Sequence, residues 1–413
     1  MFRDPNVRGV VLARLVSATG VEASFFIGLW GKAAFEFDGS PADLAAMAAL
    51  IAFGSIAGNI VGGLLVDRRD ARAVLVASEL VFVPATLALA LAGSMPQLLA
   101  LGFASWVAAG LIETSLHSMP TALVEGDEAL AAVNARLESA GWLALVAGPA
   151  LGAALVSVAD VDAVFVFDAA TSLVALLLLR GVRLRAPEQA QVPMTSLAEV
   201  RAGLAYSYTQ RPIATVMYLG SLSWLAFGVF LALEPLYFRD VLGTDVEAVG
   251  WMNALFGLGL FAGSTLLERS VDRRPGFRAA IVLSVVAGLG SLLYVGTASL
   301  AWVAAGAVIW SVPLGALLPL LRALAQRETR AGMVGRVMGA VAMQENAASI
   351  LPLAFAPWAA SALGVQAVLL ASGGLVAVGA LLAVRAARRL DDARVIAGVD
   401  TLPPQESDPV PWP

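Results

Sequence analysis

Long apolar stretches separated by short polar turns follow one another along nearly the whole chain. Each stretch reaches about 20 residues, the length that an α-helix needs to cross ~30 Å of hydrocarbon. Continuous apolar runs of this length argue against the ~10-residue alternating strands of a β-barrel. We therefore predict an all-α membrane protein with twelve transmembrane helices, at residues 9–33, 42–66, 73–94, 97–120, 132–158, 162–180, 213–236, 248–267, 278–296, 300–324, 336–360 and 365–387.

An extended hydrophilic segment follows the sixth predicted helix and runs from Gly181 to Pro212. Within it, Ser196-Leu-Ala-Glu199 matches a capping box, which predicts a short amphipathic helix on the membrane surface. The predicted divisions are an N-terminal six-helix bundle at 1–180, a cytoplasmic linker at 181–212, a C-terminal six-helix bundle at 213–390 and a disordered cytoplasmic tail at 391–413.

The positions of the basic residues predict the orientation in the membrane. With the N-terminus on the cytoplasmic side, all but three of the 26 Lys and Arg fall on that side. The exceptions are Arg14, inside the first helix, and Lys32 and Arg239, on the outer side. Since cytoplasmic loops are enriched in Lys and Arg, this segregation favours an even number of helices with both termini in the cytoplasm.

A weak internal repeat relates the two halves. The loop after the second helix reads Gly63-Leu-Leu-Val-Asp67-Arg68-Arg69, and the loop after the eighth reads Gly263-Ser-Thr-Leu-Leu-Glu268-Arg269. A small residue, an acid and then arginines at equivalent loops is typical of duplicated transporter halves around a central substrate path.

The composition excludes several kinds of functional site. The chain is 59% hydrophobic and 14% charged, with no cysteine and one histidine, which excludes disulfides, thiolate or multi-histidine metal sites and iron–sulfur clusters. No basic domain supports nucleic-acid binding, and no phosphate-binding loop, His-Glu-x-x-His or hydrolase elbow is present. We predict no cofactor, no metal and no enzymatic activity.

Two motifs resemble those of the major facilitator superfamily, and the resemblance covers nearly the whole chain. Gly63-x-Leu65-x-Asp67-Arg68 with Arg72 resembles the signature of the loop between the second and third helices, although Asp70 stands where a glycine is usual. Gly148-Pro149-Ala-Leu-Gly152-Ala153 resembles the fifth-helix motif of the antiporter branch, with Ala144 in place of its preceding glycine. The resemblance implies two pseudo-symmetric bundles.

Finer features resemble the branch of enterobactin-type siderophore exporters and of macrolide, tetracycline and multidrug efflux pumps. They are Gly20-Val-Glu22, Gly39-Ser40-Pro41, Val133-Asn134-Ala135, Phe167-Asp168-Ala169, Glu199-Val-Arg201-Ala-Gly203-Leu204 and Gly335-Arg336. The fourth helix departs from many proton-driven drug antiporters, because Trp106 stands where they have a membrane arginine.

Ionisable groups in hydrocarbon are costly and indicate function by default. At ~1.5 Å per residue, Glu22 lies about 20 Å and Glu345 about 13 Å from the cytoplasmic face, both near the midplane. We predict that these two carboxyl groups couple substrate to protons. The alternative for Glu22 is a neutral, hydrogen-bonded side chain. For Glu345, which lies between Gln344 and Asn346, it is a polar cluster that holds neighbouring helices together.

Glu113 and His117 are four residues apart and share a helix face, which makes a proton relay one interpretation and an interfacial, solvated histidine the other. Arg14 is expected to extend to the lipid headgroups. Glu79, Asp168 and Glu234 are expected near the membrane surfaces, within reach of water and without a special role.

Aromatic and loop residues complete the predicted site. Four tryptophans at depth are candidates for lining a cavity, with packing or lipid contact as the alternative: Trp106, Trp142, Trp224 and Trp310. Four charged residues at the cytoplasmic rim are predicted to gate it: Asp67, Arg68, Arg72 and Arg336. Gly148, Pro149 and Gly152 permit close helix approach and bend the fifth helix.

The sequence thus predicts a multi-pass secondary transporter of the bacterial inner membrane, which exports amphipathic small molecules such as drugs by alternating access, in antiport with protons. Its expected partners are the small-molecule substrate, protons and membrane lipids, and a monomer is expected. The alternatives are a dedicated siderophore or natural-product exporter and a membrane scaffold without transport activity.

Overall fold

The computed structural model describes residues 4–66, 68–182, 197–270, 275–330 and 332–396, and these residues form helices and no strands. The N-terminal half consists of α1 (Pro5–Ala23), its π-helical continuations η1 (Ser24–Leu29) and η2 (Gly31–Glu36), α2 (Pro41–Val66), α3 (Ala71–Ala90), α4 (Met95–Leu123), α5 (Asp127–Val158) and α6 (Asp162–Leu179). The predicted all-helical membrane protein is confirmed.

After the linker helix α7 (Leu197–Thr209), the C-terminal half repeats this plan. It consists of α8 (Arg211–Leu236) with its π-helical continuation η3 (Tyr237–Leu242), α9 (Val246–Glu268), α10 (Phe277–Val295), α11 (Leu300–Arg327), α12 (Val334–Ile350), η5 (Leu351–Ala354), α13 (Ala356–Leu363), α14 (Val365–Leu382) and α15 (Val384–Ile396).

Eleven of the helices are long and apolar enough to cross a membrane. The twelfth crossing is a broken one, formed by Val334–Ala354 and Ala356–Leu363, which meet at an angle of 42°. Pro352 and Pro357 lie at the break and each removes a backbone hydrogen-bond donor, so the chain bends there. The twelve predicted segments therefore match the structure, with this break as the addition.

The last helix, α15, is longer than the sequence predicts. It continues past Asp391, the residue at which the tail was expected to begin, to Ile396. The Asp391 carboxylate accepts hydrogen bonds of 2.8 Å from the backbone N–H groups of Phe277 and Arg278 and thereby caps the start of α10.

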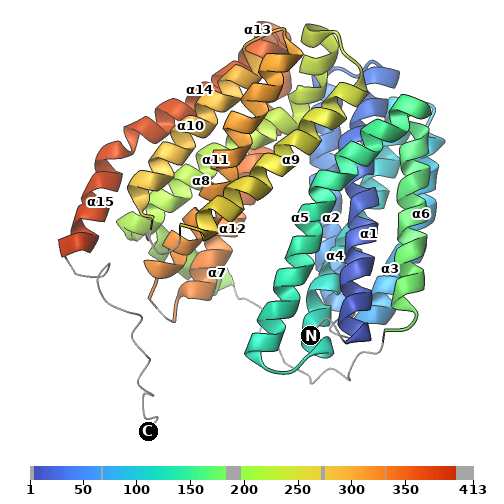
Figure 1. Ribbon diagram of the computed structural model, residues 1–413, viewed down its shortest axis with the longest axis horizontal. Helices are drawn as coiled ribbons and strands as arrows, with labels where there is room; N and C mark the ends of the chain where they lie inside the picture. The colour runs from blue at the N-terminus through green and yellow to red at the C-terminus, as the bar shows by residue number, and fades with distance from the viewer. Residues whose placement is uncertain (1–3, 67, 183–196, 271–274, 331, 397–413) are drawn as a thin grey trace.

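The two halves have the same internal arrangement (Figure 1). Neighbours in the N-terminal half follow the order α2, α4, α3, α6, α1, α5, and their counterparts in the C-terminal half follow the order α9, α11, α10, α14, α8, α12. Glycines stand at equivalent crossings: a Cβ on Gly58 of α2 would lie 2.1 Å from the Val107 carbonyl oxygen of α4, and one on Gly263 of α9 would lie 1.9 Å from that of Val312 of α11. The halves are pseudo-symmetric.

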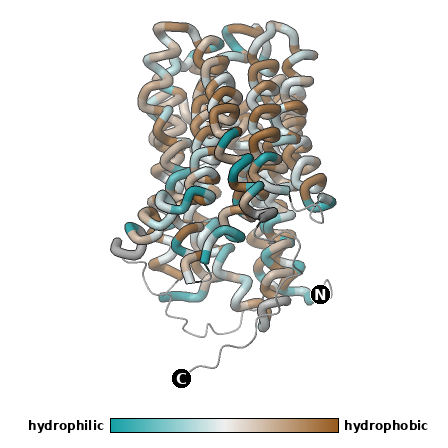
Figure 2. Tube along the Cα trace, turned by 90° about the vertical axis from the view of Figure 1, so that its left-hand side faces the viewer, coloured by the Kyte–Doolittle hydropathy of each residue, from teal (hydrophilic) through white to brown (hydrophobic). Residues whose placement is uncertain are grey.

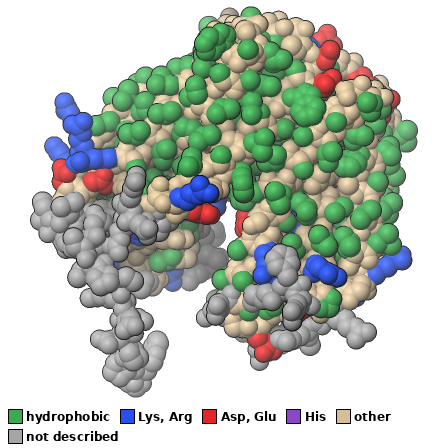
Figure 3. Space-filling view, viewed as in Figure 1, with side chains coloured by type: hydrophobic (Ala, Val, Ile, Leu, Met, Phe, Trp, Pro, Cys, Tyr) green, Lys and Arg blue, Asp and Glu red, His purple; other side chains and the backbone are tan. Residues whose placement is uncertain are grey.

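The ends of the assembly differ. We call the end at which α1 begins and α6 ends the basic end, because Arg8, Arg180 and Arg278 lie at helix ends there, and the opposite one the far end. Along the direction of the helices, hydrophilic residues gather toward the end that carries the termini, whereas the region toward the other end is mostly hydrophobic (Figure 2). A gap separates the two halves at the basic end, while their surfaces meet at the far end (Figure 3).

The close crossing of α2 and α4 yields a test of the packing. Gly58→Val would force a side chain against the α4 backbone, and we expect a loss of roughly 1–3 kcal/mol in stability, as in other overpacked interiors. Gly63→Val, on the same helix, is the matched control because a Cβ there meets no atom within 4 Å. Melting temperatures of the purified variants in detergent measure the difference, and equal values would contradict the proposed contact.

Candidate functional site

The gap between the halves is a cleft open at the basic end (Figure 3). At the far end it is closed by contacts of α5 with α9 and of α2 with α8 and α13. A Cβ on Gly250 of α9 would lie 2.7 Å from the Cβ of Ala153 and 3.0 Å from the carbonyl oxygen of Pro149, both in α5. The two helices therefore approach almost backbone to backbone at this level.

Arg14 and Glu113 join α1 to α4. Two guanidinium nitrogens of Arg14 donate to the two carboxylate oxygens of Glu113, at 2.7 and 3.2 Å. The expectation that Arg14 extends to the lipid headgroups is wrong, because a bidentate pair holds this arginine inside the half. His117 Nε2 lies 3.5 Å from Glu113 Oε1, and 65% of the histidine side chain is exposed.

Glu22 lies two turns further along α1 and is partly exposed. A Cβ on Gly148 of α5 would lie 2.5 Å from the Glu22 Cβ, and one on Gly20, on another side of α1, would meet Asp168 and Thr171 of α6. Glu22 therefore packs against α5, the helix that also contacts α9 of the opposite half. It interacts electrostatically with Arg14 and Glu113.

The glycine and proline motif of α5 occupies the junction of three helices. Gly148 accommodates α1 at Glu22, Gly152 accommodates Ile27 of η1, and the Pro149 carbonyl faces Gly250 of α9. Small residues here let α5 contact its own half and the opposite half over the same two turns.

Glu345 lies on the opposite wall, in α12. Its carboxylate is partly buried against Gly220 of α8, and it interacts with Arg322 of α11 and Trp224 of α8. The neighbouring Gln344 donates through Nε2 to the Met217 carbonyl at 3.1 Å and to the Ser221 hydroxyl, both in α8.

Gln344 also reaches the linker helix, because its Oε1 accepts a 2.5 Å hydrogen bond from the Tyr208 hydroxyl of α7. Gln344, beside Glu345, therefore ties α12 to α8 and α7.

The four tryptophans have different surroundings. Trp142 is 39% exposed and shares the face of α5 that meets α9, nearer the open end. Trp106 packs edge to face on Phe25, and Trp224 does so on Phe227. Trp310 is 8% exposed, within an aromatic cluster of the C-terminal half that includes Phe230 and Tyr294.

The predicted gate residues do not form one cluster in the part of the chain that the structure describes. Asp67 lies outside that part. Arg72 donates to the carbonyl oxygens of Leu179 and Arg180, at 2.9 and 2.8 Å, and so caps the end of α6 in its own half. Arg68 is exposed, and Arg336 is exposed at the start of α12, where it packs against Gly203 of α7.

A contact between the halves that the sequence did not predict lies at the far end. Arg239 of η3 donates through Nη1 to the carbonyl oxygens of Ala34 and Gly39, at 2.6 and 3.1 Å, and pairs with Asp38 at 2.9 Å. The only signal in the sequence was its position, since Arg239 is one of two basic residues assigned to that side. The other, Lys32, pairs with Asp162 at 2.6 Å within the N-terminal half.

Two acids expected to reach water are instead enclosed by the N-terminal half. Glu79 and Asp168 are each 1% exposed. Glu79 accepts a 3.1 Å hydrogen bond from Ser17 of α1. The expectation for these two residues is wrong, because depth along a helix does not reveal which side of the helix a residue occupies. The third, Glu234, accepts a hydrogen bond from the Tyr294 hydroxyl.

Across the described ranges, no group of three or more His, Asp or Glu side chains is arranged to hold a metal ion.

Besides its pair with Asp240 of its own helix, Arg239 contacts three oxygens of the N-terminal half, which predicts that this residue keeps the far end closed. Charge-assisted hydrogen bonds contribute about 1.5–3 kcal/mol, and with partial exposure we expect Arg239→Gln to raise opening at the far end about tenfold. The chain has no cysteine, so Val246→Cys, buried against Gly31 at this contact, is a clean reporter of maleimide labelling. Arg278→Gln, at the basic end, is the control, and equal labelling rates in the two variants would contradict this role.

The sequence profile of the Major Facilitator Superfamily matches residues 10–352 and 216–406. Among curated proteins, none matches the chain by sequence. Several solved transporters have the same fold at low identity. A POT family transporter in complex with 5-aminolevulinic acid is 13% identical, with a TM-score of 0.71, covering 93% of this chain and 96% of its own.

A bacterial homologue of the human lysosomal transporter Spinster, in an inward-facing and unoccupied conformation, is 15% identical, with a TM-score of 0.69 and coverage of 96% and 98%. The nucleoside transporter NupG is 11% identical, with a TM-score of 0.73 and coverage of 91% and 98%. These likenesses concern the fold. The profile match covers most of the chain, and the protein belongs to the Major Facilitator Superfamily.

Proposed function

We propose that this transporter is a secondary active exporter of amphipathic small molecules, which works by alternating access in antiport with protons. The basic end would face the cytoplasm of a bacterial cell, as the enrichment of cytoplasmic loops in Lys and Arg suggests. The observation that carries the proposal is the placement of Glu22, a partly exposed carboxyl group far along α1 that packs against α5, the helix in contact with the opposite half.

The asymmetry of the cleft supports alternating access. The halves are held together at the far end by α5 against α9 and by Arg239, whereas at the basic end they are apart. Export requires a second state with the opposite pattern, in which Arg239 leaves its three oxygen partners in the N-terminal half. An open basic end corresponds to the state that accepts substrate from the cytoplasm.

Glu22 has the surroundings that proton exchange requires. Unlike Glu113, it has no ion-pair partner within hydrogen-bonding distance in the described part of the chain, while Arg14 is near enough to interact with it. A carboxyl group of this kind can be neutral with a bound proton, or ionised when water or a cationic substrate is present. Substrate and proton would then compete for one group.

The opposite wall supports an amphipathic substrate. Glu345 and Arg322 supply charge, and Trp224 beside them supplies an aromatic surface. Trp142 adds a second exposed aromatic ring on the α5 side. Rings of this kind contact apolar groups over a large area and favour cations over their faces.

The energetics permit export against a gradient. One charge that moves through 100 mV supplies ~2.3 kcal/mol, and each ~1.4 kcal/mol corresponds to a tenfold ratio. One proton per cycle could therefore sustain roughly a 40-fold substrate gradient before any pH difference is added.

We predict that the transporter protects a drug-sensitised bacterial host against one or more bulky hydrophobic antibiotics, and that an uncoupler abolishes the protection. Glu22→Gln should abolish it as well, because the amide cannot exchange a proton. Glu138→Gln, an exposed position of α5, is the matched control and should keep activity. Uncoupler-sensitive efflux that survives Glu22→Gln would show that Glu22 does not couple transport to protons.

Reconstitution separates a transporter from a scaffold. In proteoliposomes with an imposed pH gradient, we expect uptake or release of a compound found in the efflux assay, together with proton movement reported by a pH-sensitive dye. Movement of the compound without protons would leave an exporter with different coupling. No movement of any tested drug or siderophore would favour a scaffold on the same fold.

A further inference from the structure

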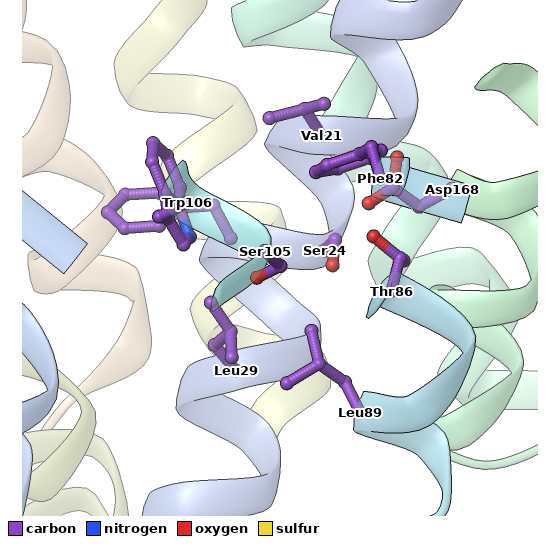
Figure 4. Close-up of a pocket in the computed structure, with 10 residues that line it drawn as sticks. Val21, Ser24, Leu29, Phe82, Thr86, Leu89, Ser105, Trp106 and Asp168 are labelled. Atoms are coloured by element: carbon purple, nitrogen blue, oxygen red, sulfur yellow. The ribbon is translucent and has the colours of Figure 1, made fainter. Parts of the chain in front are cut away.

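A small pocket lies in the N-terminal half where α1, α3, α4 and α6 come together (Figure 4). Four oxygen-bearing side chains line it: Ser24 at the start of η1, Thr86 of α3, Ser105 of α4 and Asp168 of α6. The oxygens of Ser24, Thr86 and Asp168 point toward one another, and apolar residues such as Phe82 and Leu89 form the remainder of the wall.

The carboxylate in this pocket is poorly satisfied. Asp168 is 1% exposed, and among the described groups the Ser24 hydroxyl is the one near enough to donate toward it, although neither carboxylate oxygen has a hydrogen bond of good geometry. The Thr86 hydroxyl is 0% exposed and is likewise without a partner. Buried polar groups are nearly always hydrogen-bonded, and buried charges are paired or bind a metal ion.

The packing holds Asp168 in this position. A Cβ on Gly20 would lie 2.8 Å from Asp168 Oδ1 and 2.0 Å from Thr171 Oγ1, so α1 lies directly against the carboxylate. At Ser24 the same helix changes from α-helical to π-helical geometry, an irregularity frequent at functional sites.

No cation among the described residues balances this charge. The ionisable groups that interact with Asp168 are Glu79 and Glu22, both acids. Arg14 is paired with Glu113, and Lys32 with Asp162. The electrostatic surroundings of Asp168 therefore favour a positive ligand.

The ligand set and the size of the pocket define that ligand. Carboxylate and hydroxyl oxygens are the ligands of hard cations, and there is room for a species about the size of a water molecule. Asp168 is the one carboxylate that lines the pocket, which matches a single positive charge. Glu79 is not among the residues that line the pocket, and one of its carboxylate oxygens accepts a hydrogen bond from Ser17.

We propose that this pocket binds one Na⁺ ion, coordinated by the Asp168 carboxylate and the hydroxyl oxygens of Ser24 and Thr86. The ion lies where α1 meets α3, α4 and α6, and so ties together the helix that carries Glu22 and the outer helices of its half. The site does not depend on which compound the cleft exports, or on whether it exports one.

Equilibrium binding of ²²Na⁺ to the purified protein in detergent tests the site, with choline chloride keeping the ionic strength constant. We expect saturable binding of one Na⁺ per chain. Asp168→Asn should abolish it, and Thr86→Val should weaken it about tenfold, the factor for one lost interaction of ~1.4 kcal/mol. Ser284→Ala is the matched control, because it removes a buried hydroxyl that bonds only within α10, and it should leave binding unchanged.

Size-exclusion profiles establish that the variants are folded. If Asp168→Asn aggregates, Thr86→Val and Ser24→Ala decide the test. Absence of saturable Na⁺ binding in the wild-type protein between pH 6 and pH 9 would overturn the proposal and leave Asp168 as a proton-binding group. Unchanged binding in Thr86→Val and Ser24→Ala would also overturn it. The measurement involves no transport, so its failure would not bear on export, and failure of export would not bear on it.

Discussion

The contact between α5 and α9 determines much of the remaining structure. Gly250 and the backbone at Pro149 come together so closely that the halves are joined at the far end, which leaves the basic end as the place where they can separate. The same two turns of α5 hold α1 at Gly148 and Gly152. A shift of α9 relative to α5 would therefore change the packing around Glu22, the carboxyl group on which the proposed exchange depends.

Ionised groups are costly in hydrocarbon, and this protein accommodates its ionisable side chains in three different environments. Arg14 and Glu113 neutralise each other through a bidentate pair. Glu22 is partly exposed. Asp168 has neither an ion pair nor water access in the described structure, and its oxygens face other oxygens. The first arrangement is structural, whereas the second and third leave a group able to take up a ligand.

Hydropathy was sufficient to predict the helices and their division into two halves, because the length of an apolar run depends on membrane thickness alone. It did not reveal the broken twelfth segment, whose prolines lie within an apolar run. Depth along a helix also failed for Asp168 and Arg14, since their surroundings depend on which neighbours each face meets. Those neighbours follow from helix order in space, as for Trp310, which packs in an aromatic cluster. The gate at Asp67 stays a prediction.

The two halves contribute differently to the contact between Arg239 and residues 34–39 at the far end. Two of the three oxygens of the N-terminal half that Arg239 contacts belong to the main chain, at Ala34 and Gly39. A Cβ on Gly39 would lie 2.5 Å from the Ala33 carbonyl oxygen, so the backbone path here leaves no room for a side chain at that position. The N-terminal side of the contact therefore depends on a backbone path that favours glycine at position 39, whereas the C-terminal side depends on a single guanidinium. In a set of relatives with this contact, a glycine at position 39 would therefore accompany the arginine at position 239.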